Sequence, residues 1–170
     1  MYPCAGNGLA GLIAVTVLVA SARVAEAQGS VGLAGCNPKE LGAAVAADTT
    51  KLKRSNLDFS WPEATEGASL TVYDARKEPK VIVLRFLGEL GQATNAYYLL
   101  DARNYVLVRD ELQYAAPVDV DPHAQIVSRL PSVLYVCSGK PRGALNSADA
   151  AVFMGQLDSA VATFRRSGKH

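Results

Sequence analysis

The feature that most constrains the fold is a succession of short apolar segments between residues 67 and 117. Segments 70–73, 81–87, 96–100 and 105–108 are rich in Val, Leu, Ile and Tyr, and turn-forming residues separate them. Because the connections are as short as those of hairpins, consecutive segments should pair as antiparallel neighbours. The sequence therefore predicts an antiparallel β-meander of four to six strands, to which segments 125–129 and 132–138 can add a strand or a hairpin.

A helix is expected before the meander. Asn37, Pro38 and Glu40 occupy the N-cap, N1 and N3 positions that favour a helix start. Apolar residues then recur on one face, so we expect a helix over residues 38–53. Asp48 weakens that apolar face.

A second helix is expected at the C-terminal end of the chain. Its apolar stripe recurs at helical spacing and consists of Phe153, Leu157, Ala160, Val161 and Phe164. Asn146 or Ser147 is expected to cap its start and Gly168 to end it, while Gln156 and Asp158 should point to water. A helix, an antiparallel sheet and a helix make an α+β domain, which we place at residues 37–168.

The N-terminal residues have the pattern of a signal peptide. Residues 9–22 are apolar but too few to span a membrane comfortably. Ala25, Glu26 and Ala27 have the small-x-small pattern at which signal peptidase cuts, although no Lys or Arg precedes the apolar run. We expect a signal peptide at residues 1–27, a flexible Gly-rich arm at 28–36, and a periplasmic or secreted protein. No transmembrane segment is expected in the mature chain.

Two cysteines remain after such a cleavage, Cys36 and Cys137. In an exported domain they most simply form one disulfide. The alternative is a lipidated Cys36, because residues 33–36 have the form of a lipobox. Arg23 and Glu26 interrupt the interval between the apolar run and Cys36, so the disulfide is the favoured prediction.

Charge argues against nucleic acid as the partner. The formal net charge is +1, with 17 basic and 16 acidic residues. The sequence has no stripe of Lys and Arg interleaved with aromatic residues, which a nucleic-acid-binding surface would need.

Three sets of residues are candidates for a site. Asp119, Asp121 and His123 alternate, so an extended backbone would point all three to one side as ligands for a divalent ion. Glu89, at a hairpin tip, would act as an acid or base only if burial raised its pKa. Solvated loops are the ordinary explanation of both patterns.

Tyrosines on the predicted strands are the third set. Tyr97, Tyr98, Tyr105 and Tyr114 could line a groove for a sugar or a peptide, against the ordinary alternative of packing in the sheet. Since Tyr97 and Tyr98 are adjacent, they must face opposite sides. The sequence contains no hydrolase, zinc-protease or phosphate-binding motif, and no cofactor is expected.

The pattern of the meander resembles that of a family of small uncharacterised exported bacterial proteins and lipoproteins. The residues that carry the resemblance are Gly88, Glu89 and Gly91 in a turn, Tyr97 and Tyr98 in the next strand, and Tyr105, Val106, Leu107 and Val108 before Tyr114 and Pro117. The resemblance implies export and an α+β fold, and it implies no catalytic residue.

These observations predict a non-catalytic exported domain that binds a protein or glycan partner in the cell envelope. Two alternatives remain. One is a small hydrolase or metal-dependent protein that uses Asp119, Asp121 and His123, or Glu89. The other is a lipid-anchored structural component of the envelope.

Overall fold

The computed structural model of the protein describes residues 36–62, 64, 66–117, 120–121, 123–143 and 147–168. The expected signal peptide and nearly all of the expected arm lie outside these residues. The described residues belong to one unit of the chain, Gly32–His170.

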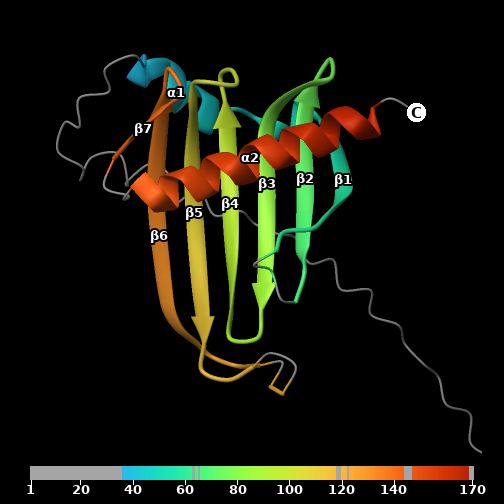
Figure 1. The fold of residues 1–170 in the computed structure, drawn as a ribbon, viewed down its shortest axis with the longest axis vertical. Helices are drawn as coiled ribbons and strands as arrows, with labels where there is room; N and C mark the ends of the chain where they lie inside the picture. The colour runs from blue at the N-terminus through green and yellow to red at the C-terminus, as the bar shows by residue number, and fades with distance from the viewer. Residues whose placement is uncertain are drawn as a thin grey trace, which may run out of the picture. The chain divides into compact units, whose positions relative to one another are not determined.

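Seven antiparallel strands form one sheet, and each strand pairs with the next in sequence (Figure 1). The strands are β1 (Lys53–Phe59), β2 (Ala68–Ala75), β3 (Glu78–Gly88), β4 (Gly91–Leu99), β5 (Tyr105–Tyr114), β6 (Ile126–Cys137) and β7 (Lys140–Arg142). The predicted antiparallel meander is confirmed, but the predicted count of four to six strands is too low. The sequence predicts an extended segment around Leu57 and Phe59 but does not predict it as a strand of the sheet, and it predicts a turn at the segment of β7.

The long strand β6 includes most of segments 125–129 and 132–138, which the sequence pattern indicates as two separate segments. Pro131 lies in its middle, opposite Asp110 of β5. A proline cannot donate a hydrogen bond to a ladder, so it fits a sheet only where its nitrogen needs no partner. On its other side β6 pairs with β7 only at Tyr135, Val136 and Cys137. Pro131 therefore lies on a stretch of β6 that is an edge of the sheet among the described residues.

The N-terminal helix is shorter than expected. α1 (Pro38–Val45) starts at the predicted cap, where the Asn37 side chain accepts a hydrogen bond from the backbone N–H of Lys39. Asp48 then caps a new 3-10 turn by accepting a 3.0 Å bond from the backbone N–H of Thr50. After this turn the chain enters β1 and pairs with β2 over seven residues. The expected helix over residues 38–53 is therefore wrong beyond residue 45, because capping and strand pairing outweigh a weak apolar face.

The C-terminal helix α2 (Ser147–Ser167) lies across one face of the sheet (Figure 1). Its predicted apolar stripe is confirmed, since Phe153, Leu157 and Ala160 are buried in the main core. That core includes Leu84 and Tyr97 from the central strands. α2 ends at Ser167, directly before Gly168, as the sequence predicts.

The smaller helix α1 packs on the opposite face. Leu41 is 1% exposed and lies with Val106 and Cys137 in a second core cluster. The predicted disulfide between Cys36 and Cys137 is present, and it ties the segment just before α1 to the end of β6. The two helices thus cover opposite faces of the sheet.

Candidate binding surface at one end of the sheet

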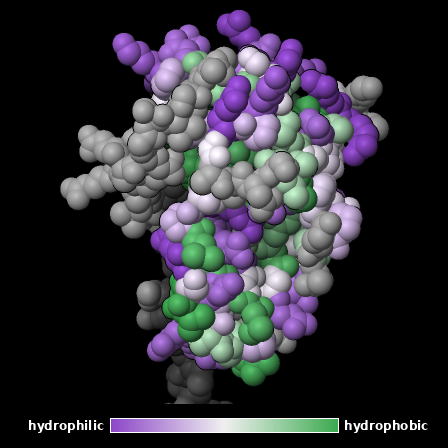
Figure 2. Space-filling view, turned by 60° about the vertical axis from the view of Figure 1, so that its left-hand side comes forward, coloured by the Kyte–Doolittle hydropathy of each residue, from purple (hydrophilic) through white to green (hydrophobic). Residues whose placement is uncertain are grey.

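Large apolar side chains gather at one end of the sheet. Five of them are 44% to 63% exposed, namely Leu87, Leu90, Ile126, Val127 and Leu130, and we call this set the apolar end. Strand register brings these residues together from distant parts of the chain. The backbone of Tyr114 bonds to Leu90, and Tyr114 pairs with Ile126. Figure 2 shows hydrophobic residues gathered in the lower half of its view, whereas the upper half is mainly hydrophilic.

The opposite end of the sheet is charged. The β2–β3 and β4–β5 turns lie there and carry Arg76, Lys77 and Arg103, and Lys140 begins β7 at the same end. Among the described residues, Val120 in the β5–β6 connection and Val152 on α2 are the other exposed large apolar residues. An apolar set concentrated at one end is the surface property that marks an interaction site.

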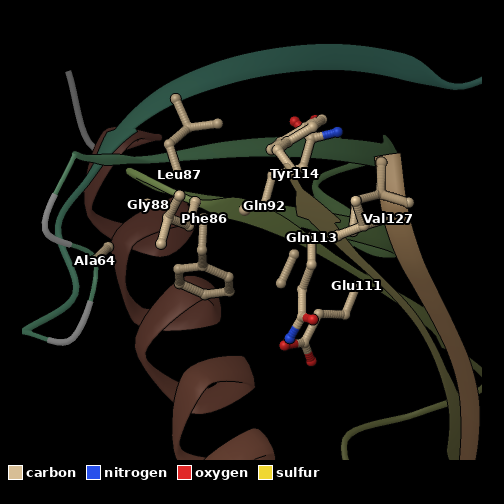
Figure 3. Close-up of a pocket in the computed structure, with 13 residues that line it drawn as sticks. Ala64, Phe86, Leu87, Gly88, Gln92, Glu111, Gln113, Tyr114 and Val127 are labelled. Carbon is tan, nitrogen blue, oxygen red and sulfur yellow. The ribbon is translucent and has the colours of Figure 1, made fainter. Parts of the chain in front are cut away.

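A groove of about 520 Å³ opens beside the apolar end (Figure 3). Phe86 and Ala64 line one side of it, and Glu111 and Gln113 line the other. In Figure 3 the side chains of Phe86, Glu111 and Gln113 point to the side of α2, and that of Leu87 points the other way. Residues from both faces of the sheet therefore line the groove, which lies at the end of the sheet beside the tip of the hairpin.

Backbone forms part of the groove, because Gly88 and Gly91 carry no side chains there. The close packing of β4 against β5 also explains the glycine at position 91. A Cβ built on Gly91 would lie 2.5 Å from the backbone oxygen of Leu112 on the neighbouring strand. β4 and β5 can approach this closely only if residue 91 is glycine.

A chain of polar side chains runs from the groove to the space beneath α2. Nη2 of Arg109 lies 2.6 Å from Oε2 of Glu111, and its Nη1 donates a 3.1 Å bond to Oδ1 of Asn95. Asn95 in turn donates a 2.8 Å bond to Oε1 of Gln156 on α2. The guanidinium group also lies 5.2 Å from the ring centre of Phe153. Arg109 thus neutralises the carboxylate that faces the groove.

The predicted exposure of Gln156 is wrong. We expected it to point to water, but it is 6% exposed and its side-chain oxygen accepts the bond from Asn95. Asp158, predicted to point to water in the same way, is exposed.

The four tyrosines named as candidates are distributed over the sheet. Tyr97 and Tyr105 lie in the main core with ring centres 6.1 Å apart. The Tyr97 hydroxyl donates a 3.0 Å bond to the backbone oxygen of Phe153. Tyr98 is half-buried on the opposite face, and Tyr114 lies at the groove. The structure does not bring the four together in one groove.

Burial determines the protonation of the inner tyrosines. It raises the pKa of Tyr97 far above the ordinary value and raises the pKa of Tyr98 as well, with the neighbouring Tyr73 as a second cause. Tyrosines held neutral in this way do not serve as acids or bases near neutral pH.

Two of the expected metal ligands, Asp121 and His123, and the expected carboxylate Glu89 lie in exposed connections. Asp119 is outside the described residues. The Asp121 side chain accepts a 2.9 Å bond from the backbone N–H of His123, which closes a local turn. Glu89 is exposed at the tip of the β3–β4 hairpin. Within the part of the chain that the structure describes, no three His, Cys, Asp or Glu side chains are grouped to hold a metal.

Sequence reasoning did not identify the apolar end. Its signals were a leucine at a hairpin tip, Leu90, and two adjacent apolar residues at a strand start, Ile126 and Val127. Neither pattern is unusual in a sequence. The register of β3, β4, β5 and β6 brings these residues to the same end of the sheet.

Comparisons of the chain with models of protein families, with curated proteins and with solved structures found no match. Among the described residues, no helix is both long and apolar enough to cross a membrane.

Proposed function

We propose that this protein is an exported, non-catalytic domain that binds a protein partner through its apolar end. One observation carries the proposal. Five large apolar side chains from β3, the β3–β4 turn and β6 are exposed beside a groove, and Val120 and Val152 are the other exposed large apolar residues in the described part of the chain. Exposing such a set to water is unfavourable, and burying it against a partner recovers the hydrophobic free energy.

The chemistry of the groove supports binding rather than catalysis. Its carboxylate, Glu111, is held in an ion pair with Arg109, 2.6 Å away. A small hydrolase or a metal-dependent protein has weaker support. Glu89 is exposed, and Asp121 is bonded locally to the backbone of His123.

The Cys36–Cys137 disulfide supports the assignment to an oxidising compartment, because such bonds persist in exported proteins. It also weakens the lipid-anchored alternative. The Sγ atom of Cys36 cannot hold Cys137 and a lipid at once.

Site-specific photo-crosslinking in the native envelope tests the proposal. A photoreactive benzoylphenylalanine replaces Leu90 in one variant and Val152 on α2 in the control. The two side chains have similar exposure, 54% and 47%. A discrete protein crosslinked from position 90 and not from position 152 is the expected result. Equal crosslinking from both positions, or none from position 90, would contradict the proposal.

A further inference from the structure

The charges around the apolar end indicate what kind of partner it binds. We infer that the apolar end binds a basic amphipathic polypeptide segment, in which Lys or Arg accompanies apolar side chains. This inference rests on the proposed function. The inference depends on two carboxylates beside the apolar end, which we call the rim carboxylates. It also depends on the acidic side chains that offset the positive charge of the nearby arginines.

The two rim carboxylates belong to Glu66 and Glu89. The backbone N–H of Glu66 donates a 3.2 Å bond to the oxygen of Leu87, so Glu66 lies directly beside this apolar residue. Glu89 immediately precedes Leu90 at the hairpin tip. Both are exposed, and neither forms an ion pair within the described ranges.

The arginines nearby are largely compensated. Arg109 pairs with Glu111, and Arg129 binds Asp110 through two bonds of 2.9 and 2.7 Å. Arg85 is in no ion pair among the described residues, and Asp58 lies in the same row of the sheet, with β2 between them. Among the described residues, this half of the sheet and the connections at its end carry six acidic and three basic side chains, namely Asp58, Glu66, Glu89, Asp110, Glu111 and Asp121 against Arg85, Arg109 and Arg129. The surface is therefore apolar with a net negative rim.

This charge favours one occupant over the others. Two copies joined through their apolar ends would bring Glu66 and Glu89 of one copy toward those of the other, which is a repulsive arrangement. An anionic membrane surface would likewise be repelled by the rim, because membrane-surface proteins use basic residues there. A segment with Leu, Ile or Phe and with Lys or Arg fits both features, since its apolar side chains cover Leu87, Leu90 and Val127 and its cations meet the rim.

Selection from a displayed library of random 12-residue peptides tests the inference on the full chain. Enriched peptides should combine apolar residues with an excess of Lys and Arg. Their affinity should fall about three- to tenfold in the double variant Glu66→Gln/Glu89→Gln, since each rim charge contributes one solvent-exposed ion pair. The control variant Glu40→Gln/Glu78→Gln removes two carboxylates far from the apolar end and should bind as the wild type does.

Other outcomes overturn the inference in distinct ways. Neutral or acidic peptides, no enrichment, or unchanged affinity in Glu66→Gln/Glu89→Gln would refute the basic partner. The proposed function would survive these results if crosslinking from position 90 remained specific. Binding to phosphatidylglycerol vesicles without peptide binding would assign the surface to membranes. A dimer in solution that Leu90→Glu dissociates would assign it to a second copy. Peptide affinity unchanged by Leu87→Ser/Leu90→Ser would refute the apolar end as the site and contradict the proposed function as well.

Discussion

The side-chain amide of Asn95 on β4 donates a 2.8 Å hydrogen bond to Oε1 of Gln156 on α2, and both residues are buried where the helix crosses the sheet. This bond satisfies a polar group on each element inside an otherwise apolar interface. Arg109 binds the other atom of the same amide, Oδ1 of Asn95, so the network fixes the orientation of that side chain. Because buried polar groups are costly when unpaired, these contacts favour one position of α2 on the sheet.

Replacing Gln156 should therefore destabilise the fold. Gln156→Ala leaves the buried amide of Asn95 without its acceptor, and we expect a loss of about 1–3 kcal/mol in the free energy of unfolding. Urea denaturation followed by circular dichroism measures this change. The control is Asp158→Ala two residues along the helix, which is exposed and should stay within about 0.5 kcal/mol of wild type. Equal losses in the two variants would contradict the packing of α2.

The disulfide should contribute strongly to stability. Cys36 and Cys137 are 101 residues apart in sequence, so their bond restricts the unfolded chain over most of the domain. We expect the double variant Cys36→Ser/Cys137→Ser to lose about 2–5 kcal/mol in urea denaturation. Reductant should lower the stability of the wild type to a similar extent and leave the variant unchanged. A wild type insensitive to reductant would contradict the prediction.

Stability should fall at alkaline pH because of the buried tyrosines. Burial, with the carboxylate of Asp158 as a second cause, raises the pKa of Tyr105 to about 12. In the unfolded chain the phenol titrates near pH 10, so above about pH 10 the folded protein retains a proton that the unfolded chain loses. The tyrosine contribution is therefore fully present below about pH 10 and is lost as the pH rises toward 12.

Urea midpoints between pH 8 and pH 11 measure this dependence. Tyr105→Phe removes one titrating phenol, and its stability should decline less steeply above about pH 10 than that of the wild type. The remaining decline includes Tyr97, whose pKa burial raises in the same direction. Identical pH profiles for the variant and the wild type would refute the assignment to Tyr105.

Two glycine substitutions should have opposite effects. Gly91→Ala places a Cβ against the backbone oxygen of Leu112, and the strand must shift, at a cost of about 1–3 kcal/mol. Gly42 lies inside α1 with no atom within 4 Å of its added Cβ. Gly42→Ala should stabilise the protein by about 1 kcal/mol, because alanine is the better helix former. Thermal unfolding of the two variants measures both changes, and destabilisation by Gly42→Ala would contradict this account of α1.

The C-terminal helix shows which buried residues can be predicted from the helical spacing of apolar residues. The stripe of Phe153, Leu157 and Ala160 follows from spacing alone, and the structure confirms it. Gln156 lies three residues after Phe153 and therefore also belongs to the buried face, so the same period could have located it. Its polarity suggested water instead. Only the partner on β4, 61 residues away in sequence, makes burial of this amide favourable.

The parts of the fold that depend on neighbouring residues could be predicted from the amino-acid sequence. Short turns between apolar segments require antiparallel pairing of successive strands, and helical spacing defines the buried stripe of α2. Long-range packing sets the outcome at positions where local preferences compete and at positions where distant residues come into contact. Pairing with β2 and the cap at Asp48 ended α1 early, and strand register assembled the apolar end. Leu90 and Val127 are 37 residues apart in the sequence. Neither segment alone encodes their proximity, because they come close only when the strands between them have paired.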